Sequence, residues 1–285
     1  MILVTGATGT TGSGVLRLLG EKGVPVRALA RNPDKVAPGF EVVRGDYEDP
    51  ASLRQALSGV EGVYLVSSPG PHIPTHDLAL VEAATEAGVR KIVKLSAFGI
   101  GEVGLETTSG WHQPGEDAIR ASGMAWTFLR PPTFASNSLA WLPQIAAGEP
   151  IPNRFGTGAI GVIDPRDISA VAMAALLTDD HDGQAYTLTG PELVTMADMV
   201  AQLGEVLGRP LRIFDEPDSA VRAEFARLGM SDEYVDVVMK GWEYVRNGGL
   251  AVLTDDVEQA LGRPATSFKE WATDHAASFR QAVDA

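Results

Sequence analysis

Three glycines near the start of the chain have the spacing of a nucleotide-binding turn. Gly6, Gly9 and Gly12 lie in the stretch GATGTTG, directly after the apolar run MILV. In such a strand-to-helix turn the first glycine permits the tight turn, the second lets a pyrophosphate approach the backbone, and the third allows close helix packing. The free N–H groups that open the helix then face the phosphates. The pattern predicts a bound dinucleotide rather than a plain tight turn, contacted by Gly6, Thr8, Gly9, Thr10, Thr11 and Gly12.

The end of the second predicted strand indicates which dinucleotide is bound. Strand 24–31 ends at Arg31, where an NAD-selective site usually places an acid that binds the ribose hydroxyls. A guanidinium there suits a 2′-phosphate, so NADP(H) is favoured, with NAD(H) as the alternative. A second interpretation of Arg31 is a surface charge that stacks on the adenine of either cofactor.

Further cofactor contacts are expected where the later strands end. Asp46 follows the third predicted strand and could accept a hydrogen bond from the adenine amino group; alternatively, it belongs to a turn or caps the next helix. The ribose should pass the end of the fourth strand, and the nicotinamide the ends of the fifth and sixth. The residues expected to contact the cofactor there are Ser67, Ser68, Pro69, Ser96 and Pro131.

Predicted strands and helices alternate over the first half of the chain. Apolar runs predict strands at 1–6, 24–31, 40–46, 62–68, 89–97 and 125–132. Helical spacing predicts helices at 13–23, 49–59, 75–88 and 112–123. This order is typical of an α/β fold with a Rossmann-type, doubly wound parallel sheet.

The alternation stops after Pro132. Residues 133–163 are rich in proline and glycine and are expected to form loops, and much of the remaining chain has helical spacing. We therefore expect an NAD(P)-binding domain at 1–132, to which 160–190 returns. Segments 133–159 and 191–285 should form a smaller, mostly helical substrate-binding lobe.

Composition excludes several classes of function. The 285 residues include 23 Lys and Arg against 37 Asp and Glu, a net charge of −14, which argues against binding nucleic acid or an anionic membrane. The absence of cysteine excludes disulfides, thiolate nucleophiles and cysteine-ligated metals. His72 and His76 are four residues apart, but Pro74 lies between them and no metal is expected. The N-terminus has no basic region or signal-type apolar stretch, so we expect a cytoplasmic protein, as a monomer or homodimer.

Several longer stretches resemble the NmrA-like branch of atypical short-chain dehydrogenases/reductases. They are GATGTTG, ARNPDK, GDYEDPASL, AATEAGVRKIVKLSA, WHQPGEDAIRASGMAWTFLRPPTFASN, IDPRDISAVAMAAL, TLTGPELVTMADM, TDDVEQALG and SFKEWATDH. The resemblance covers nearly the whole chain and implies a Rossmann fold with a small substrate lobe. Members include NAD(P)H-dependent quinone reductases, triphenylmethane dye reductases and redox-sensing regulators that bind NADP.

The chain departs from the usual catalytic pair of the wider superfamily, Tyr-x-x-x-Lys. The helix after the fifth strand lacks this pair, and His112 stands at the position that resembles the lysine, as in several reductases of this branch. His112 and Ser96 are the predicted catalytic residues. An imidazole that titrates near its ordinary pKa could supply a proton at neutral pH, and Glu116, four residues on, could raise the pKa of His112 and orient it. Alternatively, His112 is a helix cap or cofactor contact, Ser96 a structural hydroxyl and Glu116 a helix-terminus charge.

Aromatic residues after the sixth strand could form a substrate pocket. Flat side chains there could stack on a planar ring system. Asn137 matches an asparagine common in the family and could orient the substrate or the loop. The predicted pocket residues are Phe134, Asn137, Trp141 and Phe155.

These features predict an NAD(P)H-dependent oxidoreductase that transfers a hydride to a quinone or a similar planar conjugated aromatic ketone. The missing Tyr-x-x-x-Lys also permits a non-catalytic, NADP(H)-binding redox sensor that acts through a protein partner. An epimerase or isomerase is less favoured, because the extended relatives with that activity normally retain the tyrosine.

Overall fold

The chain folds into two compact units, each built from several chain segments. The computed structural model describes residues 1–101 and 108–284. The first unit comprises Met1–Pro131, Pro165–Leu188 and Asp256–Arg263, and the second comprises Pro132–Asp164, Thr189–Asp255 and Pro264–Ala285.

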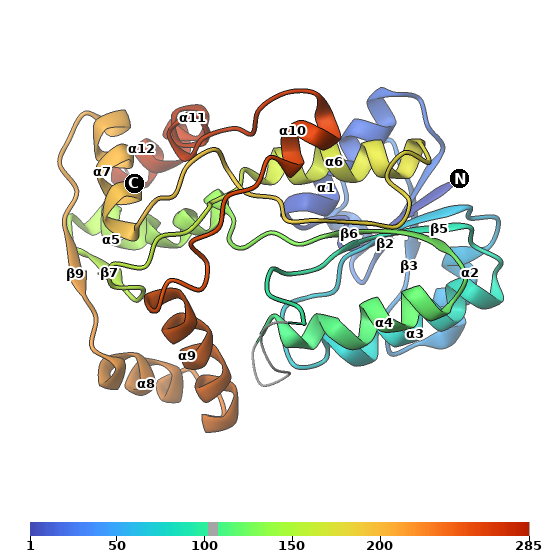
Figure 1. Cartoon of the computed structure of the whole chain (residues 1–285), viewed down its shortest axis with the longest axis horizontal. Helices are drawn as coiled ribbons and strands as arrows, with labels where there is room; N and C mark the ends of the chain where they lie inside the picture. Colours follow the sequence, from blue (N-terminus) through green and yellow to red (C-terminus); the bar gives the residue numbers. More distant parts are fainter. Residues whose placement is uncertain (102–107, 285) are drawn as a thin grey trace. The chain divides into compact units, whose positions relative to one another are not determined.

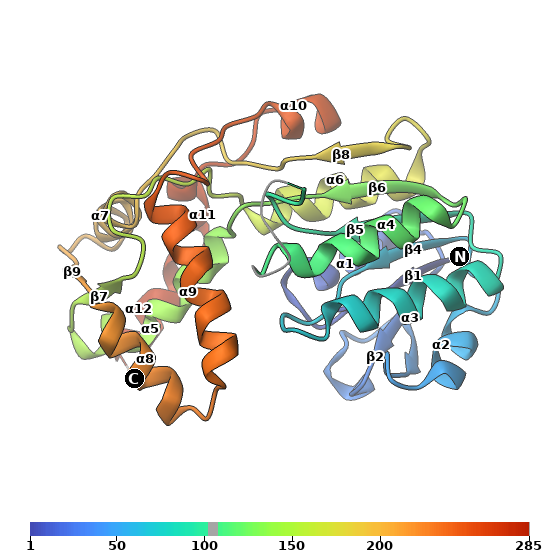
Figure 2. The same ribbon diagram turned by 60° about the horizontal axis from the view of Figure 1, so that its bottom comes forward.

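A parallel sheet forms the centre of the first unit. Its strands lie in the order β3-β2-β1-β4-β5-β6-β8, and every neighbouring pair is parallel (Figure 2). The strands are β1 (Ile2–Val4), β2 (Val26–Ala30), β3 (Glu41–Arg44), β4 (Gly62–Leu65), β5 (Lys91–Leu95), β6 (Ala125–Leu129) and β8 (Gln184–Tyr186). The order reverses between β1 and β4, the switch point at which sheets of this kind bind their ligands. The predicted α/β, Rossmann-type fold is confirmed.

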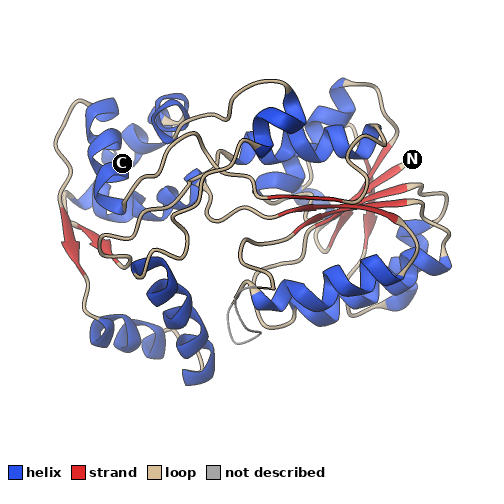
Figure 3. Cartoon of the chain, in the orientation of Figure 1, coloured by secondary structure: helices blue, strands red, loops and turns tan. Residues whose placement is uncertain are grey.

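Helices cover both faces of this sheet (Figures 1 and 3). One face carries α1 (Thr10–Glu21) and α6 (Pro165–Leu177), with α10 (Asp256–Leu261) packed on α6. The other face carries α2 (Pro50–Leu57), α3 (Ile73–Glu86) and α4 (Gln113–Ala121). Short 3-10 turns, η1 (Pro33–Lys35) and η2 (Gly110–His112), precede β3 and α4. Because helices cover both faces of the sheet, the central strands consist almost entirely of apolar residues.

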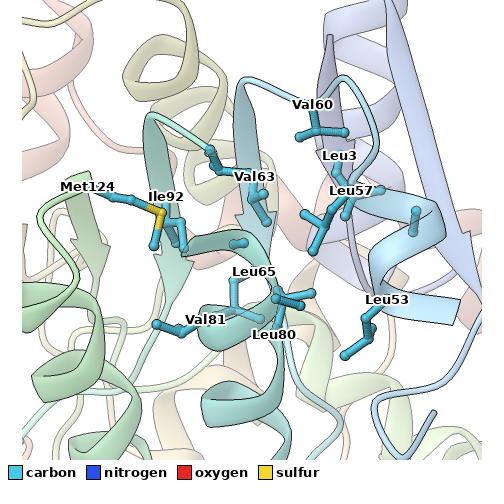
Figure 4. Close-up of a cluster of buried hydrophobic side chains, with 14 of the residues drawn as sticks. Leu3, Leu53, Leu57, Val60, Val63, Leu65, Leu80, Val81, Ile92 and Met124 are labelled. Atoms are coloured by element: carbon cyan, nitrogen blue, oxygen red, sulfur yellow. The ribbon is translucent and has the colours of Figure 1, made fainter. Parts of the chain in front are cut away.

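Apolar side chains fill the space between the sheet and α2 to α4 (Figure 4). Leu53 and Leu57 of α2 and Leu80 of α3 are fully buried against strand residues such as Leu65. Burial of these apolar side chains is the main term that stabilises the unit, at about 25 cal/mol per Å² of apolar surface. The packed core also fixes the carboxyl ends of the strands, where the candidate site lies.

A fourth glycine after β1 serves helix packing. A Cβ atom at Gly14 would lie 2.4 Å from the Oγ atom of Ser169 in α6. That hydroxyl donates to the carbonyl oxygens of Thr11 and Pro165. Gly14 therefore lets α1 and α6 approach closely.

The second unit is mostly helical and contains a small sheet that the sequence did not predict. Strands β7 (Ile151–Asn153) and β9 (Ile213–Asp215) pair in parallel. Residues 133–163, expected to be loops, also include η3 (Ala135–Trp141) and α5 (Leu142–Ala147). Such short elements carry too few residues to show a periodic pattern. The remaining helices are α7 (Met196–Leu207), α8 (Asp218–Arg227), α9 (Asp232–Arg246), α11 (Phe268–Asp274) and α12 (Ala276–Asp284).

The expected assignment of all of 191–285 to the smaller lobe was wrong at α10. This helix belongs to the first unit, where the Asp256 carboxylate accepts the Thr187 N–H at 2.6 Å. The Arg263 guanidinium, just beyond α10, lies 2.7 Å from the Asp167 carboxylate in α6. Both contacts join residues that are far apart in the sequence, so no local sequence pattern predicts them. Among the described helices, none is both long and apolar enough to cross a membrane.

Candidate active site

The glycine turn joins β1 to α1 at the carboxyl edge of the sheet. Gly6 has a φ of +57°, a left-handed conformation that favours glycine. A Cβ atom at Gly12 would lie 2.1 Å from the carbonyl oxygen of Gly6, so no side chain fits there. Gly9 is the N-cap residue of α1, and no side chain caps this helix. The first turn of α1 also lacks acidic residues, which leaves its N–H groups suited to an anion.

Gly9 leaves space in which a phosphate could approach the backbone of the turn. A Cβ atom at Gly9 would meet Gly6 O at 3.2 Å and nothing else within 4 Å. The backbone of Gly9 is extended, with φ −90° and ψ 177°, which other residues adopt readily. The backbone conformation of this position therefore does not require glycine, and a Cβ atom there would need only a small shift of Gly6 O. Exposed Thr8 and Thr10 flank it, whereas Thr11 is buried.

The predicted adenosine-binding residues follow β2 and β3. Arg31 is exposed and makes no hydrogen bond or ion pair with the rest of the described chain. Its guanidinium is therefore available to an anionic ligand. The Asp46 carboxylate accepts the N–H of Glu48 at 3.1 Å, so this residue closes a turn, and Asp49 caps α2 instead. A contact between Asp46 and adenine stays a prediction.

A buried ion pair lies behind the ends of β4 and β5. The Nζ atom of Lys94 in β5 lies 2.6 Å from Oδ2 of Asp77 in α3, and both side chains are fully buried. The Ser67 hydroxyl, just beyond β4, donates to Oδ1 of Asp77 at 2.6 Å. Gly115 of α4 makes room for this carboxylate, because a Cβ atom there would lie 2.4 Å from Oδ2. Ser68 and Pro69 are exposed and remain candidate cofactor contacts.

His112 contacts this ion pair. Its Nδ1 atom lies 3.1 Å from the Nζ atom of Lys94. Burial, and then the charge of Lys94, hold the pKa of His112 well below its ordinary value. The imidazole is therefore neutral at neutral pH. His112 is the N-cap residue of α4, but its side chain makes no capping hydrogen bond.

Glu116 does not act on His112, contrary to the sequence-based expectation. Its fully buried carboxylate accepts hydrogen bonds from Ser96 at 2.7 Å, from Arg120 at 2.9 Å and from the guanidinium of Arg130. The pKa of His112 is lowered rather than raised. His112 ends the 3-10 turn η2, so the helical spacing that places residues four apart on one face does not extend back to it.

Ser96 is buried, and its hydroxyl is engaged by Glu116. This arrangement links the end of β5 to α4, and a catalytic role for Ser96 stays a prediction. Pro131 is also buried, and its carbonyl oxygen accepts the Phe98 N–H at 3.1 Å.

The predicted substrate-pocket residues all belong to the second unit. Trp141 and Phe155 are half-buried and pack against one apolar core of that unit. Phe155 also meets the ring of Trp242 edge to face. Phe134 precedes η3, and exposed Asn137 lies within it. Their role in a pocket stays a prediction.

Sequence reasoning missed Lys94 and Asp77, although each carried a signal. Lys94 stands within the apolar run of a central strand, where an unpaired charge would be costly. Asp77 lies on the buried face of α3 with Ile73, Leu80 and Val81. A lysine and an aspartate that are both buried in one core are expected to form an ion pair, because an unpaired buried charge is costly.

Comparisons with known proteins agree with this fold. Residues 6–179 match a family model described as NAD(P)H-binding. The chain is 41% identical over 287 residues to (4-alkanoyl-5-oxo-2,5-dihydrofuran-3-yl)methyl phosphate reductase from Streptomyces griseus, covering 98% of this chain and 99% of that protein. It is 35% identical over 283 residues to NAD(P)H azoreductase from Xenophilus azovorans, with 98% and 99% covered.

A solved structure with a similar fold is the NADPH-dependent quinone oxidoreductase of Escherichia coli, complexed with NADPH. It has a TM-score of 0.83 and 28% identity, and the match covers 96% of this chain and 99% of that one. The chain therefore belongs to the NAD(P)H-binding family, and the resemblance to NmrA-like reductases is confirmed. It is an NAD(P)H-dependent reductase.

Proposed function

We propose that this protein transfers a hydride from NADPH to a quinone or a similar planar conjugated aromatic ketone. The observation that carries the proposal is the likeness, over 96% of the chain, to an NADPH-dependent quinone oxidoreductase. The guanidinium of Arg31 is exposed and has no ion-pair partner among the described residues. It supports NADPH over NADH, because it suits the 2′-phosphate. A cytoplasmic location accompanies the proposal as a prediction.

The cofactor, when bound, supplies the hydride. Gly6, Gly9 and Gly12 would hold its pyrophosphate at the start of α1. His112 would donate a hydrogen bond to the acceptor oxygen, on which negative charge develops as the ring is reduced. A neutral imidazole suits this role, because its N–H donor persists across neutral pH.

A second candidate substrate is an unsaturated lactone phosphate. The relative from Streptomyces griseus, at 41% identity, is named for such a compound. The ring double bond in that substrate is conjugated with carbonyl groups and can accept a hydride at carbon. Both candidates share an electron-poor conjugated system, and they differ in the phosphate.

The test is stopped-flow absorbance of NADPH mixed with the protein and one acceptor at a time. The panel contains naphthoquinone, anthraquinone, an azo dye and an alkanoyl butenolide phosphate. Rapid oxidation with a quinone, slowed by roughly 10²-fold in His112→Ala, supports the proposal. Oxidation with the lactone phosphate alone replaces it by the second candidate. Tight NADPH binding without oxidation by any acceptor refutes both and favours the redox sensor.

A further inference from the structure

We propose that Lys94 is a positioning residue, which fixes His112 as the tautomer that carries its proton on Nε2. Lys94, in turn, is held by Asp77. The inference deepens the proposed function and rests on it for the role of His112 in reduction. Its structural content can be tested without any substrate.

The argument starts from the hydrogen bonds of a buried ammonium group. A lysine ammonium has three N–H donors and no lone pair that could accept a hydrogen bond. The Nζ atom of Lys94 has three neighbours that can accept: Oδ2 of Asp77 at 2.6 Å, the carbonyl oxygen of Leu95 at 3.3 Å and Nδ1 of His112 at 3.1 Å. The Asp77 contact is an ion pair, and an ammonium group can make the other two contacts only as a donor.

This set of contacts determines the tautomer of His112. Because the ammonium can only donate, Nδ1 of His112 must accept and cannot carry a proton. A neutral imidazole with a bare Nδ1 carries its proton on Nε2. The N–H donor of His112 then lies on the side of the ring away from Lys94.

Asp77 is the charged partner of Lys94 inside the protein. Both side chains are fully buried, where an unpaired charge would be costly. The carboxylate supplies the opposite charge, and the Ser67 hydroxyl satisfies its second oxygen at 2.6 Å. Among the residues that the structure describes, the charged groups on this side of the imidazole are Lys94 from β5 and, behind it, Asp77 from α3. On the imidazole's own side, Glu116 of α4 is engaged with Ser96, Arg120 and Arg130.

The decisive measurement is a long-range ¹H–¹⁵N correlation spectrum of the protein without cofactor, labelled at its histidines. The chain has five histidines, and the signals missing from His112→Gln identify those of His112. We expect a protonated, pyrrole-type Nε2 and a bare, pyridine-type Nδ1, unchanged between about pH 6 and pH 8. A protonated Nδ1, or an ordinary titration near the usual histidine pKa, would overturn the proposal.

Two variants separate positioning from general stability. Lys94→Met removes the donor to Nδ1, so His112 should show mixed tautomers and a pKa that is less strongly lowered, because burial remains when the charge of Lys94 is gone. Lys91→Met is the matched control, because Lys91 is also buried in β5 and pairs with Asp179 and Asp182 at 2.9 and 2.8 Å. It should leave the His112 spectrum unchanged. An unaltered spectrum in a folded Lys94→Met protein would contradict the proposal, and if that variant does not fold, the wild-type spectrum decides alone.

Kinetics provide a second readout. If quinone reduction is observed, Lys94→Met should lower kcat by about tenfold with little change in KM, because substrate contacts remain and only the donor is misplaced. If no acceptor is reduced, the proposed function fails, whereas the tautomer assignment stands or falls on the spectrum.

Discussion

Lys94 and Asp77 form an ion pair of 2.6 Å in which neither side chain has exposed surface. The pair joins a central strand to α3 and lies next to His112. Taking two charges out of water is expensive, so such a pair is weak evidence of stabilisation by itself. We infer that the role of this pair is to fix the tautomer of the His112 imidazole beside it.

Breaking this pair should destabilise the fold strongly. Lys94→Met leaves the Asp77 carboxylate buried without its partner, which should cost about 3–5 kcal/mol of unfolding free energy. The double variant Lys94→Met/Asp77→Leu should recover most of this loss, because it leaves no unpaired charge. Urea denaturation measures both. A single variant as stable as the wild type would show that water or another group solvates Asp77.

Removing the guanidinium of Arg31 should change cofactor selectivity. Arg31→Ala should raise the Kd for NADPH by about 10- to 100-fold, the value of a hydrogen bond between charged groups, and leave the Kd for NADH nearly unchanged. Fluorescence titration with each nucleotide measures the two constants. The control is Arg17→Ala, which removes an exposed arginine paired with Glu21 in α1. An equal loss of affinity for both nucleotides would instead support stacking of Arg31 on adenine.

Two glycines of the turn should respond differently to the same substitution. Gly9→Ala needs only a small shift of Gly6 O, at 3.2 Å, so the Tm without nucleotide should hardly change while NADPH affinity falls by at least about tenfold. Gly12→Ala places a methyl group 2.1 Å from Gly6 O and should cost about 2 kcal/mol or more of stability. Thermal unfolding and nucleotide titration of both variants check this. Unimpaired NADPH binding by Gly9→Ala would place the phosphates elsewhere.

The pH dependence of stability should carry a contribution from His112. The folded protein holds the pKa of His112 well below 6.5, its ordinary value in the unfolded chain, because of burial and the charge of Lys94. Below pH 6.5 the unfolded state therefore binds the extra proton, and the free energy of unfolding falls as the pH falls, by at most about 1.4 kcal/mol per pH unit. His112→Gln should lose this part of the slope in urea denaturation between about pH 5 and pH 6.5. Identical slopes for the two proteins would contradict the shift.

The sequence predicted the sheet and the glycine turn because both depend on local patterns. Apolar runs and the spacing of Gly6, Gly9 and Gly12 are visible within a few residues. The interior of the site is different. Lys94 and Asp77 meet through the packing of α3 on β5, and Glu116 turns to Arg130 rather than to His112. The partner of each buried charge depends on which helices and strands pack together. The spacing of residues along the chain does not contain that information.

The place of α10 also affects how the protein can fold during synthesis. The first unit takes its last segment from residues 256–263, after most of the second unit has been made. The nucleotide-binding unit is therefore incomplete until its last segment has been synthesised. A chain truncated at residue 131 would lack α6, β8 and α10. Domains generally fold as units. We expect the nascent nucleotide-binding unit to stay incomplete until residue 263 has emerged.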